Sequence, residues 1–284
     1  MEDAEPSLLA LVVDVSGPFW RKRGVEREQS GLSTFQETLE ALFIFIESFL
    51  LLHRRNDLCF IAATRGRSAM LYPTPQLVAH GKSLSDDTSS AKDVHSCIVQ
   101  GLSEITRIEK GTGSCAGMAK ALTQALCYAS KKRGQVPSTQ AQVLVLQAEP
   151  DQAPHYNGIM NCIFAAQKAQ IIVDCCVLRG SSMFLQQAAY LTGGIYTQYQ
   201  EPHLLQHLLM NFLPSGSVRN YLKLPRQAEV DFQASCFCHR NIVDIAWVCS
   251  VCLSVFCEFS PVCSTCGARA PPPNSVKKKR TSKH

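Results

Sequence analysis

The sequence predicts an α/β fold, in which helices cover both faces of a mostly parallel sheet, followed by a small module that binds zinc. Short apolar runs alternate with amphipathic helical patterns over residues 1–225, the order typical of a parallel sheet with crossover helices. Half of the 14 cysteines lie between Cys236 and Cys266. Apolar residues make up 46% of the chain and charged residues 18%, which supports one full-sized core and excludes disorder over most of the length.

The chain begins with a strand, a helix and a hairpin. Residues 8–13 form a short apolar run that ends at Asp14, and its length and β-branched content predict a strand buried on both faces. Apolar residues at helical spacing over 39–50 predict a long helix on one face of the sheet. Residues 58–63 and 68–72 flank a turn-prone segment, so we expect them to pair as a hairpin at one edge.

The rest of the first 225 residues alternates between helices and strands. We expect helices over 91–109, 114–132, 158–168, 184–191 and 204–212, and strands over 143–146, 171–178 and 194–198. Pro214, Gly216 and Pro225 then mark the exit from this domain. We therefore divide the chain into an α/β domain (1–225), a cysteine-rich zinc-binding module (226–267) and a basic disordered tail (268–284).

Four cysteines have the spacing of a zinc site, because Cys249-x2-Cys252 is followed after ten residues by Cys263-x2-Cys266. Each C-x-x-C bends into a turn that points two thiolates at one ion, and two such turns complete a tetrahedral site. In the reducing interior of the cell, clustered cysteines bind metal rather than form disulfides. The expected metal is Zn2+ in a structural role, since four thiolates leave no open coordination position for catalysis.

Three further cysteines and a histidine surround this quartet: Cys236, Cys238, His239 and Cys257. In a cross-braced, RING-like module the first and third ligand pairs bind one ion, and the second and fourth pairs bind the other. The first pair here can be two of Cys236, Cys238 and His239, whereas the third offers only Cys257 with no second sulfur nearby. The sequence leaves open both a second zinc at these residues and a single site around which they pack.

A candidate site follows the first strand at its carboxyl end, where open α/β sheets bind ligands. Asp14-Val15-Ser16 resembles the D-x-S-x-S metal site of von Willebrand factor A domains, and the order of strands and helices resembles that family as well. Pro18 stands in place of the second serine, and Gln147-Ala148-Glu149 stands where the family has an aspartate. A hard divalent ion then has too few oxygen ligands. We expect a degenerate site used for protein contacts.

A hydrolase motif is also present. Residues 113–117 fit the G-x-C-x-G elbow of a cysteine hydrolase, with His155, His203 and His207 downstream as bases. That elbow needs an apolar strand immediately before it, and the charged residues 107–110 do not provide one. We therefore find no credible active site and expect no enzyme activity.

The formal charge of +5 belongs to the tail. Residues 267–284 hold six of the 28 basic residues and none of the 23 acidic ones, which leaves 22 basic against 23 acidic residues elsewhere. A nearly neutral body gives no support to a large basic face for nucleic acid, so DNA contact would be indirect or through 277–280 in the tail. The acidic start and a longest apolar run of residues 41–52 predict neither a secretion signal nor a membrane span.

The cysteine segments, which follow an A-like domain, carry a closer resemblance. CFCHRN, CSVCLSVFC and FSPVCSTC resemble the smaller of the two A-domain subunits of general transcription factor IIH, and residues 118–128 and 161–168 add to the resemblance. It implies a nuclear, non-catalytic scaffold subunit of the IIH core complex, acting in RNA polymerase II transcription initiation and nucleotide excision repair. The implied partners are the other core subunits, especially the larger A-domain subunit.

Two alternatives from other classes remain. A RING-like ubiquitin ligase would recruit a conjugating enzyme with the zinc module and a substrate with the A-like domain, but its cross-brace needs an eighth ligand that the sequence does not obviously offer. Direct DNA recognition by the zinc module would predict salt-dependent binding by residues 226–284.

Overall fold

The structure, a computed structural model, describes most of the chain. The described residues are 6–17, 19–20, 35–73, 91–108, 117–151, 156–199, 203–219, 221–225, 230, 234–239, 241–252 and 254–269. They belong to two compact units, within Met1–Phe232 and within Gln233–His284, and each unit is described by itself. The first contains the sheet and its helices, and the second contains the cysteine cluster. The predicted division at residues 225 and 226 and the predicted disorder of 268–284 stay predictions.

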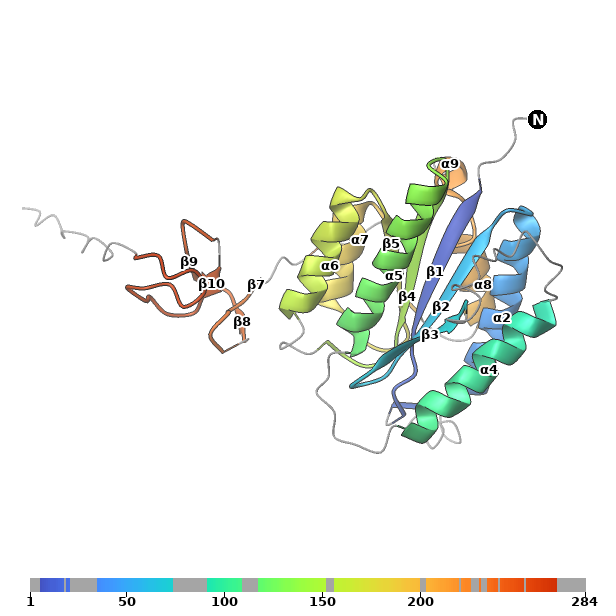
Figure 1. Ribbon diagram of the computed structural model, residues 1–284, viewed down its shortest axis with the longest axis horizontal. Coiled ribbons are helices and arrows are strands. Elements are labelled where there is room, and N and C mark those ends of the chain that lie inside the picture. The colour runs from blue at the N-terminus through green and yellow to red at the C-terminus, as the bar shows by residue number, and fades with distance from the viewer. Residues whose placement is uncertain are drawn as a thin grey trace, which may run out of the picture. The chain divides into compact units, whose positions relative to one another are not determined.

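One six-stranded sheet forms the centre of the first unit (Figure 1). The strands have the order β3-β2-β1-β4-β5-β6, and all pairs are parallel except β2 with β3. The strands are β1 (Ser7–Asp14), β2 (Asp57–Ala63), β3 (Ser68–Tyr72), β4 (Gln140–Gln147), β5 (Ile172–Val177) and β6 (Tyr196–Gln198). The predicted fold class is confirmed, including the hairpin at one edge. The order in which successive strands are added changes direction at β1 and β4, with β2 and β3 on one side and β5 and β6 on the other. This makes the carboxyl ends of β1 and β4 the topological switch point.

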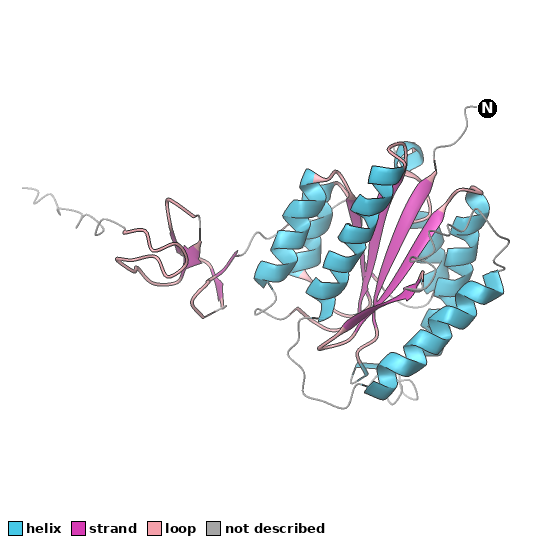
Figure 2. Cartoon of the chain, viewed as in Figure 1, coloured by secondary structure: helices cyan, strands magenta, loops and turns pink. Residues whose placement is uncertain are grey.

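Helices cover both faces of this sheet (Figure 2). On one face lie α2 (Phe35–Leu52), α4 (Ala91–Ile108) and α8 (Leu204–Asn211), and on the other lie α5 (Gly117–Gln135), α6 (Tyr156–Lys168) and α7 (Met183–Thr192). A short helix, α9 (Gly216–Arg219), follows α8. None of the helices in the described ranges is both long and apolar enough to cross a membrane.

The first strand, β1, shows why the sheet has two cores. Its side chains alternate between them, with Leu9, Leu11 and Val13 in one and Leu8, Ala10 and Val12 in the other. Successive side chains of a strand point to opposite faces, so a strand buried on both faces needs a continuous apolar run. The prediction that residues 8–13 form such a strand is confirmed.

Glycines lie at two helix boundaries. Helix α5 is described from Gly117, and the predicted start at residue 114 lies outside the described residues; a Cβ at Gly117 would lie 1.7 Å from the carbonyl oxygen of Thr64. Helix α7 ends at Gly193, whose φ of 73° is in the left-handed region. The last strand then begins at Tyr196 rather than at 194, because the backbone N–H of Ile195 donates to a side chain of β5 instead of to a strand.

That side chain is Asp174 of β5, which forms a buried ion pair with Arg219 at the end of α9. Asp174 is 0% exposed and Arg219 of α9 is 8% exposed. The guanidinium donates to the two carboxylate oxygens at 2.9 and 2.6 Å, and Gln142 Nε2 donates to the same carboxylate at 2.6 Å. The pair fastens the segment that follows the sheet to the middle of β5. Neither α9 nor this pair was predicted from the sequence.

Candidate metal centres

The second unit consists of short antiparallel strand pairs joined by tight turns. The pairs are β7 (Ala234–Ser235) with β8 (Ile242–Val243), and β9 (Trp247–Val248) with β10 (Val255–Phe256). The same type of turn occurs three times. In each, the backbone N–H of a cysteine donates to the carbonyl oxygen of the residue five positions later. The bonds are Cys236 to Asn241, Cys249 to Ser254 and Cys263 to Ala268, at 2.8–3.0 Å. Each turn begins at a cysteine that belongs to one of two groups of candidate metal ligands.

The predicted quartet of cysteines comes together in space. The ligand atoms of Cys249, Cys252, Cys263 and Cys266 all lie within 4.8 Å of one another. The sulfurs of Cys249 and Cys266 are 3.7 Å apart, and those of Cys252 and Cys263 are 3.6 Å apart. Zn–S bonds of about 2.3 Å in a tetrahedral site place sulfurs about 3.8 Å apart. The four residues therefore fit a zinc ion.

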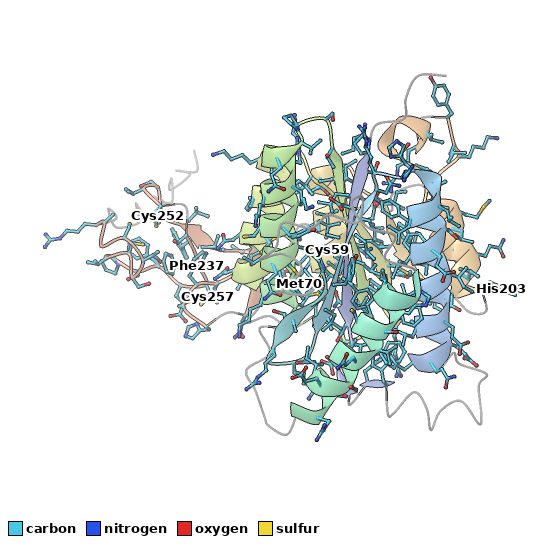
Figure 3. All side chains as sticks on the ribbon, turned by 45° about the vertical axis from the view of Figure 1, so that its right-hand side comes forward. Cys59, Met70, His203, Phe237, Cys252 and Cys257 are labelled. Carbon is cyan, nitrogen blue, oxygen red and sulfur yellow. The ribbon has the colours of Figure 1, made fainter. Side chains whose placement is uncertain are left out.

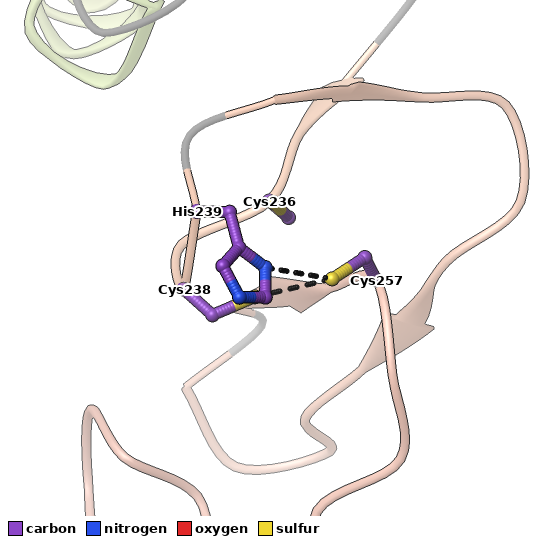
Figure 4. A group of neighbouring side chains, drawn as sticks. All are labelled: Cys236, Cys238, His239 and Cys257. Carbon is purple, nitrogen blue, oxygen red and sulfur yellow. Dashed lines mark hydrogen bonds between the residues drawn. The ribbon is translucent and has the colours of Figure 1, made fainter.

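A second group of four forms beside it, from Cys236, Cys238, His239 and Cys257 (Figure 4). Their ligand atoms also lie within 4.8 Å of one another. Cys257 Sγ is 3.4 Å from Cys238 Sγ and 3.2 Å from His239 Nδ1. Three sulfurs and one imidazole nitrogen make a donor set that zinc accepts.

The two groups interleave along the chain, as in a cross-brace. Cys257, from the second group, lies along the chain between Cys252 and Cys263 of the first group, and Figure 3 places Cys252 and Cys257 in the same unit. The sequence suggested two ligands from residues 236–239 and left Cys257 without a partner, whereas the structure brings all three of those residues to Cys257. These are the four residues at which the sequence left a second zinc site open, and together they could hold a metal ion.

One thiol in each group has a clearly shifted pKa. Side-chain and backbone hydrogen bonds with Ser254 lower the pKa of Cys252 to about 6. The hydrogen bond with Cys238, together with burial, raises the pKa of Cys257 to about 11. The sulfurs in each group are crowded, at 3.4–3.7 Å from one another in the closest pairs. A divalent cation relieves this crowding by replacing the protons, which is the chemistry of a thiolate metal site.

The Asp14 site at the carboxyl edge, defined as the edge at which the parallel strands end, has a different character. Asp14 is 5% exposed, and its carboxylate accepts four hydrogen bonds from protein groups. Oδ1 accepts from the backbone N–H and hydroxyl of Ser16, at 3.1 and 2.6 Å. Oδ2 accepts from the backbone N–H groups of Ala148 and Glu149, at 3.2 and 2.8 Å. The carboxylate ties β1 to the end of β4.

An ion pair between Arg65 and Glu149 also lies at the carboxyl edge. Arg65, in the β2–β3 turn, donates to the carboxylate of Glu149 through Nε at 3.0 and 3.2 Å and approaches it through its terminal nitrogen at 2.9 Å. Glu149 stands in the segment where an A domain has a metal-site aspartate, and here a guanidinium neutralises it. A pocket of about 60 Å3 remains at this edge, and Asp14, Ser16 and Glu149 are among the residues that line it.

We expect Asp14→Ala to lower the free energy of unfolding by about 2–3 kcal/mol, because three backbone N–H groups, two of them buried, lose their acceptor. The loss should be the same with and without magnesium, as measured by urea denaturation. Asp14→Asn keeps the side-chain shape and one carbonyl oxygen, so it should cost less. A magnesium-dependent stability of the unchanged protein that Asp14→Asn removes would show that the site binds metal.

The structure describes only part of the hydrolase motif and its downstream histidines. Cys115 and His155 lie outside the described residues. His203 precedes α8 with a left-handed φ of 98°, and Figure 3 shows it at the periphery of the first unit. The ring of His207 packs edge-on against Tyr199.

Together the fold and the clusters define a class of protein: a von Willebrand A-like α/β domain followed by a cysteine-rich module that can hold two metal ions. The family described as transcription factor Tfb4 matches residues 6–267, and the chain belongs to this family. The resemblance noted from the cysteine segments is thereby confirmed.

Named relatives cover most of the chain. General transcription factor IIH subunit 3 of Dictyostelium discoideum is 35% identical over 265 residues, which are 87% of this chain and 71% of that protein. The IIH subunit tfb4 of Schizosaccharomyces pombe is 33% identical over 273 residues, covering 93% and 90% of the two chains. The crystal structure of the TFIIH p34 N-terminal domain has a TM-score of 0.64 at 23% identity, covering 75% of this chain and 100% of that domain, and supports the fold. The family is thus one of subunits of a general transcription and DNA repair factor.

Proposed function

We propose that this chain is a non-catalytic scaffold subunit of the transcription factor IIH core complex in the nucleus. It would act in transcription initiation by RNA polymerase II and in nucleotide excision repair, through protein contacts of the A-like domain and of the zinc module. Membership in the Tfb4 family supports the complex and the two processes. The scaffold role is supported by the geometry of the two candidate sites.

The hydrogen-bonded Asp14 carboxylate is the observation that carries this proposal. The switch point between β1 and β4 is where a sheet of this kind binds ligands. Here the carboxylate has four protein donors, and Glu149 pairs with Arg65. Backbone and guanidinium groups thus do the work that a metal ion does in an A domain with an intact site, so the edge holds its shape without a metal ion.

The cysteine module would hold two structural zinc ions. One would bind Cys249, Cys252, Cys263 and Cys266, and the other would bind Cys236, Cys238, His239 and Cys257. Each set supplies four protein ligands, which leaves no coordination position for water or substrate. The metal would supply the folding energy of a unit that is too small for a large apolar core. We assign this role to residues 226–267, and a solubilising or targeting role to the basic tail 268–284.

Co-purification tests the proposal. Tagged full-length protein isolated from nuclear extract should carry the other IIH core subunits, including the larger A-domain subunit, in fixed stoichiometry. Complexes that contain the protein should support promoter opening and repair incision, and the isolated chain should show no catalytic activity in either assay. A tagged protein that enters the nucleus and purifies without IIH subunits would refute the proposal.

The cross-braced arrangement of eight ligands favours a second candidate, a RING-like ubiquitin ligase. The lack of an obvious eighth ligand had counted against this alternative, and the grouping of Cys236, Cys238, His239 and Cys257 weakens that objection. A zinc content of two per chain no longer separates the candidates, because both require it. Discharge of ubiquitin from a charged conjugating enzyme does separate them, and we expect the purified chain to give no discharge above background.

A further inference from the structure

The amino edge of the sheet, at which the parallel strands begin, is a distinctive surface of the first unit. In a fold of alternating strands and helices, the helices that cross over end near this edge. Figure 1 shows the end of α2, the end of α5 and helix α9 at the same end of the sheet as the start of β1. Segments distant in the sequence therefore share one surface.

Positive charge gathers at this edge. Five exposed basic residues lie there, none of them paired with a carboxylate in the part of the chain that the structure describes: Arg54, Arg55, Lys131, Lys168 and Lys223. Within described residues 50–57, 128–140, 166–172 and 208–225 the one acidic residue is Asp57, which Lys132 already neutralises at 2.9 Å. Among the described residues, this edge is therefore basic, although the charge summed over the body is near zero.

Exposed apolar side chains lie among these charges. Leu51 is 86% exposed at the end of α2, and Tyr221 is 90% exposed just after α9. The same two segments add Leu52, Val218 and Leu222. Large apolar side chains exposed together with Arg and Tyr are the composition of a protein interface rather than of a solvated surface.

Buried polar contacts hold the edge in place. Arg219 fastens α9 to β5 through Asp174, and Arg133, at the end of α5, donates to the carbonyl of Ala169 after α6. Lys132 joins α5 to the start of β2. A surface held in this way loses little conformational entropy when a partner binds.

We propose that the amino edge docks an acidic segment of a partner protein, whose carboxylates meet the basic residues and whose apolar side chains cover Leu51, Leu52 and Tyr221. This inference rests on the proposed function and names the chemistry of one of its contacts. Nucleic acid presents phosphates but no apolar groups for the leucines, so the exposed aliphatic side chains favour protein. The charge favours an acidic partner over a neutral one.

Photo-crosslinking in the assembled complex tests the docking site. Leu52→p-benzoylphenylalanine in the full chain should crosslink, in the purified complex, to a segment of another subunit that is rich in Asp and Glu and contains apolar residues. Adding Arg54→Glu and Arg55→Glu should lower the crosslink yield by about tenfold, because attraction becomes repulsion. Reversing two acidic residues of the crosslinked segment to Arg should restore most of the yield.

The matched control is Arg67→Glu with Lys120→Glu, which changes the charge equally at the carboxyl edge and should leave the yield unchanged. Three results would each overturn the inference. They are an adduct that nuclease removes, an adduct to the acidic segment 1–5 of the same chain, and the absence of any adduct. Loss of the other IIH subunits from the unmodified complex would instead refute the proposed function, so the two failures are distinguishable.

Discussion

Replacing Arg219 by methionine should lower the free energy of unfolding of the A-like domain by about 3–5 kcal/mol. The carboxylate of Asp174 is 0% exposed, and the substitution leaves it in the core with only neutral donors, Gln142 Nε2 and the N–H of Ile195. Methionine fills much of the volume of arginine, so the loss comes from the uncompensated charge rather than from a cavity. Urea denaturation of the full chain, followed by far-UV circular dichroism, measures the change.

Two further variants identify the cause of this loss. Adding Asp174→Asn to Arg219→Met removes the buried charge and keeps an acceptor for Ile195, so it should recover at least half of the stability. Arg107→Met, at an exposed position on α4, should change the free energy by no more than about 0.5 kcal/mol. If Arg219→Met costs less than about 1 kcal/mol, the ion pair does not fasten α9 to the sheet.

The strands of the sheet could be predicted because each strand shows its burial in its own short sequence, as a run of apolar residues. The run over residues 8–13 is apolar at each position, and only a strand between two cores needs that pattern. The Asp174–Arg219 pair has no comparable signal, because its partners are 45 residues apart and the aspartate interrupts an otherwise apolar strand. Pairing of that kind becomes visible only when the topology brings the two residues together.

The metal clusters show the same limit. Paired C-x-x-C spacing predicted Cys249, Cys252, Cys263 and Cys266, because each pair lies within one turn. The other cluster takes three ligands from residues 236–239 and one from Cys257, and no fixed spacing marks such a set. The basic amino edge was also hidden, since a net charge summed along the chain does not show which end of each helix carries it.

Replacing Cys252 by serine should release zinc from the C-terminal module and unfold it. A full-length preparation that holds about two zinc ions per chain should fall well below one, because structural zinc supplies on the order of 10 kcal/mol of folding free energy to modules of this kind. Both ions should be affected, since Cys257 of the other cluster lies between Cys252 and Cys263. The backbone bond from Phe237 to Val255 also connects the two clusters. Colorimetric zinc release with a thiol-blocking reagent measures the content.

The first unit should remain folded in this variant, because its two cores contain none of the ligands. Trp20 reports on it, since its side chain is buried beside Phe19 and Phe35, so its fluorescence in a Trp247→Phe background should not change. Cys127→Ser, at an exposed cysteine of α5, provides the matched control and should retain both ions. Cys252→Ser protein that keeps two zinc ions would exclude Cys252 as a ligand, and loss of one ion alone would show that the two sites fold independently.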